Sequence, residues 1–174
     1  NFMRQKKGFG PEPCVNDKVI CLRNYWEDYS INADSDPLVN GTIGYLLETP
    51  EKIKLNAPRY IYQPGEIDAL SIHMMSDADQ EYLSYIDPNI INGKDSVLTS
   101  YDKYKLGKAK QRIGDVIPRE FAYAYAITVH KSQGSEWNKV LVMEENFPRD
   151  KMEHARWLYT ACTRAAEKLV VIRK

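Results

Sequence analysis

A cluster of polar side chains follows an apolar run, 121–127, in the last third of the chain. The cluster consists of Thr128, His130, Lys131, Ser132, Gln133, Gly134 and Glu136. In open α/β sheets, ligands bind where a buried strand ends in a polar turn. Hydroxyl and backbone N–H groups suit phosphate oxygens, and a glycine lets the backbone approach a ligand closely. The pattern predicts a binding site, although a plain turn can have the same composition.

Arg164 is the second candidate, and it lies in a segment, 149–166, that is predicted to be helical. A guanidinium group is always charged and offers a planar fork of donors to phosphate oxygens. Most arginines are solvated surface residues, and that is the alternative for Arg164. Solvation is likewise the alternative for Lys131 and Glu136, and a structural role is the alternative for His130.

Strands and helices alternate in the C-terminal third. The predicted strands cover 121–127, 140–143 and 168–172, and the predicted helix over 149–166 begins after Pro148. Alternation at this spacing predicts an α/β fold in which helices cover a parallel sheet.

The first two thirds of the chain have a different pattern. We expect a loop over 1–13 and strands over 15–22 and 42–47. Prolines in the region 48–113 predict short strands and loops. Two helices are also predicted there. One covers 77–86, after a capping-box sequence, and the other covers 97–112, where Gly107 weakens it.

Composition restricts the class of protein. The chain has 174 residues, 43% of them hydrophobic, and a formal net charge of zero. These values are typical of a globular protein, and no apolar run is long enough to cross a membrane. The cysteines Cys14, Cys21 and Cys162 lack metal-ligand spacing, which indicates reduced thiols in a cytoplasmic protein.

Charge is unevenly distributed along the chain. Region 60–93 holds six acidic residues and no Lys or Arg, whereas 101–112 holds five cations and one acidic residue. Tyr101 and Tyr104 lie in the basic segment, which is either a solvated helix face or a nucleic-acid contact.

The two candidate segments resemble two motifs of superfamily 1 helicases. Residues 126–137, with the polar cluster, resemble motif V, most closely in RecD-like and Dda-like enzymes. Residues 156–165, with their Thr-Arg-Ala sequence, resemble motif VI. Segments 17–24 and 40–44 also resemble the RecD-like and Dda-like family.

The resemblance implies a RecA-like second motor domain, with a parallel sheet and covering helices, that is interrupted by an accessory insertion. Residues 1–47 would form its first part, and 114–174 would carry motifs V and VI. The insertion, 48–113, would be a small mixed β/α domain, and such insertions are often barrel-like in this family.

The implied function is that of the C-terminal half of an ATP-dependent DNA helicase or translocase. In this family, ATP hydrolysis at an inter-domain cleft drives movement on single-stranded DNA, here with 5′-to-3′ polarity. The chain has no Gly-x-x-x-x-Gly-Lys-Ser/Thr phosphate loop. That loop and the Mg²⁺ ligands are expected in an N-terminal RecA-like domain of the same polypeptide, so the 174 residues alone are expected to be inactive.

The resemblance also assigns roles to residues. Arg164 would be the catalytic residue that reaches the γ-phosphate of ATP. The nucleotide-binding residues would be Gln133, Gly134, Glu136 and Arg164. The DNA-binding residues would be Thr128, His130, Lys131 and Ser132. No metal ligand is expected in this chain. The family includes α-subunits of exodeoxyribonuclease V, so other subunits of a recombination or replication complex are further expected partners.

A second class of function stays open at this point. The chain could be a non-catalytic module, derived from a helicase domain, that binds single strands or a protein partner. A phosphate loop upstream in the gene would distinguish the motor from the module.

Overall fold

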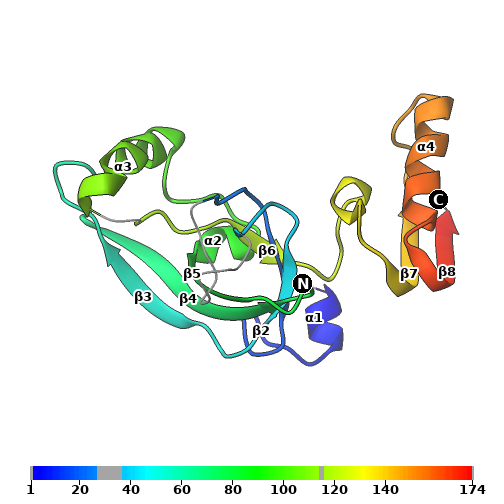
Figure 1. Ribbon diagram of the computed structural model, residues 1–174, viewed down its shortest axis with the longest axis horizontal. Coiled ribbons are helices and arrows are strands. Elements are labelled where there is room, and N and C mark those ends of the chain that lie inside the picture. Colours follow the sequence, from blue (N-terminus) through cyan, green and yellow to red (C-terminus); the bar gives the residue numbers. More distant parts are fainter. Residues whose placement is uncertain (1, 27–36, 114–115, 174) are drawn as a thin grey trace. The chain divides into compact units, whose positions relative to one another are not determined.

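The computed structural model describes residues 2–26, 37–113 and 116–173 (Figure 1). The chain forms two compact units, Asn1–Tyr125 and Ala126–Lys174, named unit 1 and unit 2 below. The predicted domain boundaries, 47/48 and 113/114, both fall inside unit 1, and they stay predictions. No described helix combines the length and the apolar character that crossing a membrane requires.

Unit 1 is built on a six-stranded antiparallel sheet that curls around its core (Figure 1). The strands are β1 (Lys18–Cys21), β2 (Ile43–Leu46), β3 (Glu51–Asn56), β4 (Glu66–Ser76), β5 (Glu81–Ile86) and β6 (Phe121–Tyr123). The order is β3-β4-β2-β1-β6, and β5 pairs with β4 outside this path. The predicted strands over 15–22 and 42–47 are therefore confirmed as β1 and β2. Pairing of β2 with β4 and of β1 with β6 crosses both predicted domain boundaries.

A hairpin replaces the helix predicted over 77–86, so that prediction was wrong. β4 and β5 pair in register from Met75 opposite Glu81 to Leu70 opposite Ile86. The Ser76 hydroxyl accepts a hydrogen bond from the Gln80 backbone N–H at 3.0 Å, which closes the turn. Side chains of β5 alternate between buried and exposed positions, the period of a strand. The capping-box sequence serves here as a turn, because Ser and Asp side chains favour both structures.

Three helices complete the described part of unit 1. The short helices are α1 (Phe2–Lys6), where a loop was predicted, and α2 (Pro88–Ile91). The longer α3 (Ser100–Ile113) confirms the helix predicted over 97–112, and it continues through Gly107. Leu106 of α3 packs into an apolar cluster with Ala57, Ile67, Leu98 and Val116. This cluster holds α3 against the β3–β4 end of the sheet.

A buried ion pair fixes α1 to β1. Arg4 and Asp17 are 1% and 0% exposed, and their side chains form two hydrogen bonds of 2.8 and 2.7 Å. Asp17 also accepts hydrogen bonds from the Cys14 backbone N–H and from the Tyr125 hydroxyl, both at 2.9 Å. The Arg4 guanidinium lies 4.1 Å from the centroid of the Tyr123 ring. The pair therefore links the N-terminal segment, β1 and the end of β6.

Unit 2 is a small parallel α/β unit. It contains the 3₁₀ helix η1 (Val129–Ser132), β7 (Trp137–Glu144), α4 (Lys151–Cys162) and β8 (Ala165–Arg173). β7 and β8 pair in parallel, from Trp137 opposite Ala165 to Glu144 opposite Arg173. The strands predicted over 140–143 and 168–172 and the helix over 149–166 are thus confirmed, with shifted ends.

The predicted parallel sheet included a strand over 121–127, and this part of the prediction was wrong. β6 ends at Tyr123, and it pairs antiparallel with β1 rather than with β7 or β8. Phe121 is fully buried in the core of unit 1, whereas 122–125 are half-buried and Ala126 is exposed. An apolar run indicates burial but does not identify the pairing partner. The chain is a mixed α/β protein with a curled antiparallel sheet and a small parallel sheet.

Candidate functional site

The turn that carries most of the predicted site residues is held by its own hydroxyl groups. Thr128 precedes η1 with extended backbone angles, and its side chain accepts a hydrogen bond from the Lys131 backbone N–H at 3.4 Å. Ser132 is 6% exposed, and its hydroxyl donates to the Val129 carbonyl at 2.7 Å. Thr128 therefore lies on the surface of the turn, whereas Ser132 lies beneath it.

Gly134 gives the turn a backbone conformation that other residues adopt with strain. Its φ angle is +81°, in the left-handed region. A Cβ atom added at this position would meet no heavy atom within 4 Å. The glycine is therefore required for the path of the backbone, and the space beside it is open.

Arg164 connects the end of α4 with this turn. Its Nη1 donates to the Ser135 carbonyl at 3.0 Å, and its Nε donates to the Thr160 carbonyl at 3.2 Å. Its Nη2 donates to the Thr163 hydroxyl at 3.2 Å. A guanidinium carries five N–H groups, so three such contacts leave two for a ligand. The Arg164 carbonyl in turn accepts from the Trp137 backbone N–H at 2.9 Å.

The structure thus brings the two sequence candidates together through Ser135, which the sequence analysis did not single out. Gln133 and Glu136 lie on either side of Ser135 in the sequence, and both are exposed. His130 is exposed and Lys131 is half-buried on η1. Among the residues that the structure describes, the side chains of His130, Gln133 and Glu136 make no hydrogen bond. They are free to meet a ligand from solvent.

A second set of contacts positions α4. The Asp150 carboxylate caps the helix by accepting from the backbone N–H groups of Met152 and Glu153, both at 3.0 Å. His154 Nε2 lies 3.0 Å from Glu144 Oε1 at the end of β7, and this hydrogen bond holds the pKa of Glu144 below its usual value. Because Arg164 follows α4 in the chain, contacts that fix α4 also fix the position of Arg164 beside the turn.

Possible metal ligands do not gather at this site in the part of the chain that the structure describes. Across the described ranges, His, Cys, Asp and Glu side chains form no group of three or more that could hold a metal ion.

Comparison with protein families addresses this C-terminal segment. Residues 123–172 match a family model, and this range includes the turn, β7, α4 and all of β8 except Arg173. The segment matches a UvrD-like helicase C-terminal domain. This helicase-like segment contains the polar cluster and Arg164.

The chain spans 4% of the length of the curated relative that it matches and about 30% of the length of the solved structures with which it aligns. An uncharacterized protein of Methanocaldococcus jannaschii is 46% identical over 55 residues, which are 31% of this chain and 4% of that protein. The Pif1 helicase of Candida albicans aligns with a TM-score of 0.47 and 18% identity, over 92% of this chain and 31% of that one. A Bacteroides Pif1 helicase in complex with ADP-AlF3 and ssDNA aligns with a TM-score of 0.45 and 14% identity, over 90% and 28%.

Proposed function

We propose that this chain is part of the second motor domain of an ATP-dependent DNA helicase or translocase. The motor couples ATP hydrolysis at a cleft between two domains to 5′-to-3′ movement on single-stranded DNA. The observation that carries the proposal is the 3.0 Å hydrogen bond from Arg164 to the Ser135 carbonyl. It joins the motif VI arginine to the motif V turn inside a segment that matches a helicase domain.

The nucleotide side of the site consists of Gln133, Gly134, Glu136 and Arg164. ATP is held between unit 2 and a phosphate-loop domain outside these 174 residues, and that domain supplies the Mg²⁺ ligands. The two remaining N–H groups of Arg164 stabilise charge on the γ-phosphoryl group as it is transferred. The Glu136 carboxylate accepts hydrogen bonds from the ribose hydroxyls.

The DNA side consists of the exposed part of the turn. Thr128, His130 and Lys131 lie on or beside η1, where a hydroxyl, an imidazole and an ammonium group meet phosphate oxygens. Ser132 supports this surface from below, since its hydroxyl is already bonded to Val129. Contacts of this kind bind the backbone rather than the bases, so affinity falls with salt and varies little with sequence.

The two sides are connected by a short covalent and hydrogen-bonded path. Ser135 lies three residues after Ser132, and its backbone N–H donates to the Ser132 carbonyl at 3.1 Å. When the two remaining N–H groups of Arg164 bind the γ-phosphate, the hydrogen bond from Arg164 to the Ser135 carbonyl is altered, and η1 shifts with it. This is how occupancy of the nucleotide site alters the grip on DNA.

Paired titrations test the division of the turn into two sides. The protein is this chain joined to its phosphate-loop domain, and the ligands are a fluorescent single strand and a fluorescent ATP analogue. Thr128→Ala and His130→Ala should weaken binding of the strand and leave ATP binding in the absence of DNA nearly intact. Glu136→Ala should weaken ATP binding and spare the strand.

Two controls make the titrations interpretable. Thr128→Ser keeps the hydroxyl and should bind the strand normally, and Glu145→Ala removes an exposed carboxylate just after β7 without effect on either ligand. Equal weakening of one ligand by Thr128→Ala and Glu136→Ala would contradict the proposed division. Unchanged ATP binding in every variant would favour the non-catalytic module instead.

A further inference from the structure

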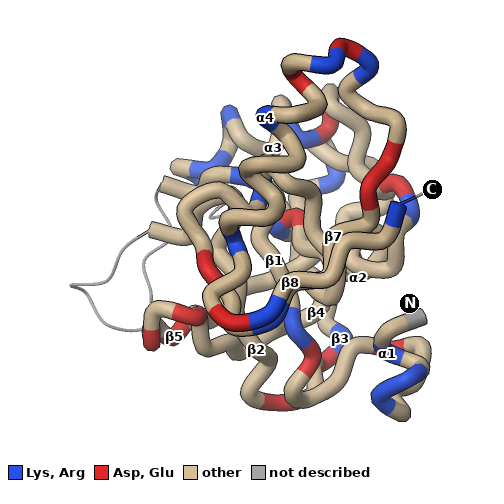
Figure 2. The backbone as a smooth tube through the Cα atoms, turned by 90° about the vertical axis from the view of Figure 1, so that its right-hand side faces the viewer, with Lys and Arg blue, Asp and Glu red and all other residues tan. Residues whose placement is uncertain are grey.

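The outer face of α3 combines exposed tyrosines with cations. Tyr101 and Tyr104 are 67% and 57% exposed, one helical turn apart, whereas Leu106 on the opposite face is 1% exposed. The helix carries five cations and one acidic residue, Asp102. Figure 2 marks the Lys and Arg positions of the chain in blue and the Asp and Glu positions in red. Large aromatic side chains bury well, so two of them on one exposed helix face mark a contact surface rather than part of the core.

Each tyrosine ring has a lysine ammonium group beside it. Lys105 Nζ lies 4.7 Å from the centroid of the Tyr101 ring, and Lys108 Nζ lies 4.7 Å from that of Tyr104. Two lysines of this helix form ion pairs: Lys103 with Glu120 at 2.8 Å and Lys105 with Asp102 at 3.7 Å. The outer face therefore carries two tyrosine–lysine pairs, each made of one exposed ring and one cation.

Such a tyrosine–lysine pair matches the chemistry of a nucleotide, in which a flat base lies close to a charged phosphate. Aromatic rings stack bases without sequence preference, and cations along the same groove follow the backbone. The two tyrosines are separated by roughly 4.5 Å along the helix axis, comparable with the rise of about 3.4 Å between stacked nucleotides. A base pair in a duplex buries the faces that stacking needs, so the surface fits a single strand.

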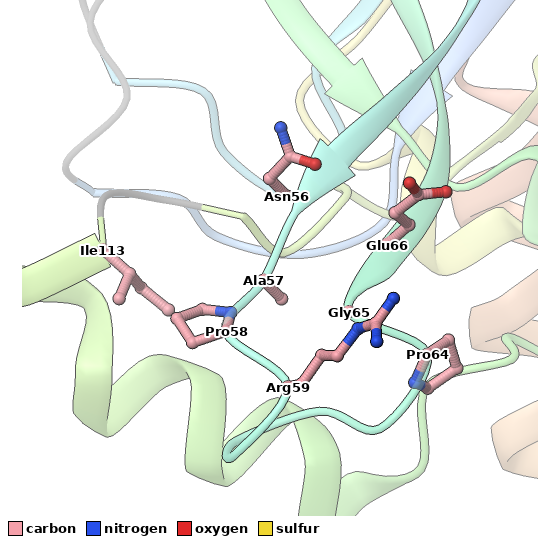
Figure 3. Close-up of a pocket in the computed structure, with 8 residues that line it drawn as sticks. All are labelled: Asn56, Ala57, Pro58, Arg59, Pro64, Gly65, Glu66 and Ile113. Carbon is pink, nitrogen blue, oxygen red and sulfur yellow. The ribbon is translucent and has the colours of Figure 1, made fainter.

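The loop beside α3 extends the same surface. Lys105 Nζ donates to the Ile61 carbonyl at 2.8 Å, which fixes this loop to the helix. The neighbouring Tyr60 is 82% exposed. Figure 3 shows the Arg59 side chain reaching across a hollow between Pro58 and Pro64, with Ile113 at the end of α3 on its border. A further ring and a further cation thus lie next to the helix.

We propose that the outer face of α3 is a binding surface for single-stranded DNA. Tyr101 and Tyr104 stack bases, and Lys105, Lys108 and Arg112 contact phosphates. The surface lies in unit 1 and needs no nucleotide, so the proposal does not depend on the Arg164 site.

The test uses the full chain without ATP, a fluorescent oligodeoxythymidine of about 20 nucleotides, and anisotropy titrations at several salt concentrations. Tyr101→Ala with Tyr104→Ala should weaken binding at least about fivefold and leave the salt dependence unchanged, because stacking is uncharged. Lys108→Ala with Arg112→Ala should weaken binding and lower the slope of log affinity against log salt by about 1.4, or about 0.7 for each lost phosphate contact.

Matched variants elsewhere in unit 1 are the controls. Tyr85→Ala removes a 42% exposed tyrosine from β5, and Lys52→Ala with Lys94→Ala removes two exposed lysines that are not part of α3. Both should bind like the wild type. The proposal is overturned if the α3 variants bind like the wild type, or if the controls lose as much affinity as they do. Duplex binding as strong as that of the single strand, with no effect of the tyrosine changes, would also overturn it.

Discussion

Replacing Arg4 with methionine should strongly destabilise unit 1. Arg4 and Asp17 are almost fully buried and share two hydrogen bonds of 2.8 and 2.7 Å. Removing one partner of such a pair leaves a buried charge without its counter-charge, which typically costs about 3–5 kcal/mol. The N–H of Cys14 and the hydroxyl of Tyr125 still donate to the carboxylate in the variant. We therefore expect a loss at the lower end, about 3 kcal/mol.

The matched control is Arg23→Met. Arg23 pairs with Glu120 at 2.9 Å, but its side chain is 67% exposed, and exposed pairs contribute about 1 kcal/mol at most. Adding Asp17→Asn to Arg4→Met removes the unpaired charge and should recover part of the stability. Hydrogen exchange of the β1 and β6 amides at increasing denaturant measures the free energy of opening in unit 1. Equal losses for Arg4→Met and Arg23→Met would refute the reasoning.

Acid should reduce the difference between the wild type and Arg4→Met. Burial alone would raise the pKa of Asp17, but hydrogen bonds from Arg4, Cys14 and Tyr125 outweigh it and hold the pKa below its usual value. A lowered pKa stabilises the fold above the unfolded-state value of about 3.9, and that contribution is lost as the pH falls through the folded value. The same exchange measurement at pH 7 and near pH 3 should show the gap closing. A constant gap would mean that the charge of Asp17 contributes little.

Three further predictions concern unit 2 and the chain as a whole. The purified 174-residue chain should release no phosphate from ATP with or without single-stranded DNA, because its sequence has no phosphate loop; DNA-stimulated turnover by this chain alone would contradict the expectation. Gly134→Ala should cost unit 2 about 1–2 kcal/mol in a urea unfolding experiment, since φ is +81° there. Gly134→Asn should cost less, and a neutral alanine would show that the turn relaxes freely. Asp150→Ala removes two hydrogen bonds at the start of α4 and should lower its stability by about 1 kcal/mol, seen as a lower thermal midpoint.

The sequence predicts individual strands and helices better than it predicts which strands pair with one another. The apolar residues of β7 and β8 and the helix between them are recognisable because each element carries its own pattern. The pairing of β6 with β1 joins segments about one hundred residues apart, and no local pattern encodes it. The prediction of a helix over 77–86 was wrong for a related reason. Helix caps and turns use the same side chains, and pairing with strand β4 decides between the two structures.

In the candidate site, too, the residue types are predictable from the sequence, whereas the contacts between segments are not. The polar residue types and the glycine indicate a functional turn, and its φ angle explains why glycine is needed. The contact between Arg164 and Ser135 uses a backbone carbonyl, which every residue has, so no residue type predicts it. The burial of Ser132 was likewise not predictable, because a serine in a polar cluster has the composition of a surface residue.

The most direct test of the proposed motor is the rate of DNA-stimulated phosphate release by Arg164→Ala, in this chain joined to its phosphate-loop domain. Loss of an arginine that stabilises the transferred phosphoryl group lowers the rate on the order of a thousandfold or more. Arg164→Lys should restore little, because an ammonium lacks the planar fork. Arg156→Ala, which removes an exposed arginine on α4, should keep the wild-type rate. Near-normal turnover in Arg164→Ala, with single-strand binding intact, would contradict the account and leave Arg164 as an anchor for the Ser135 carbonyl alone.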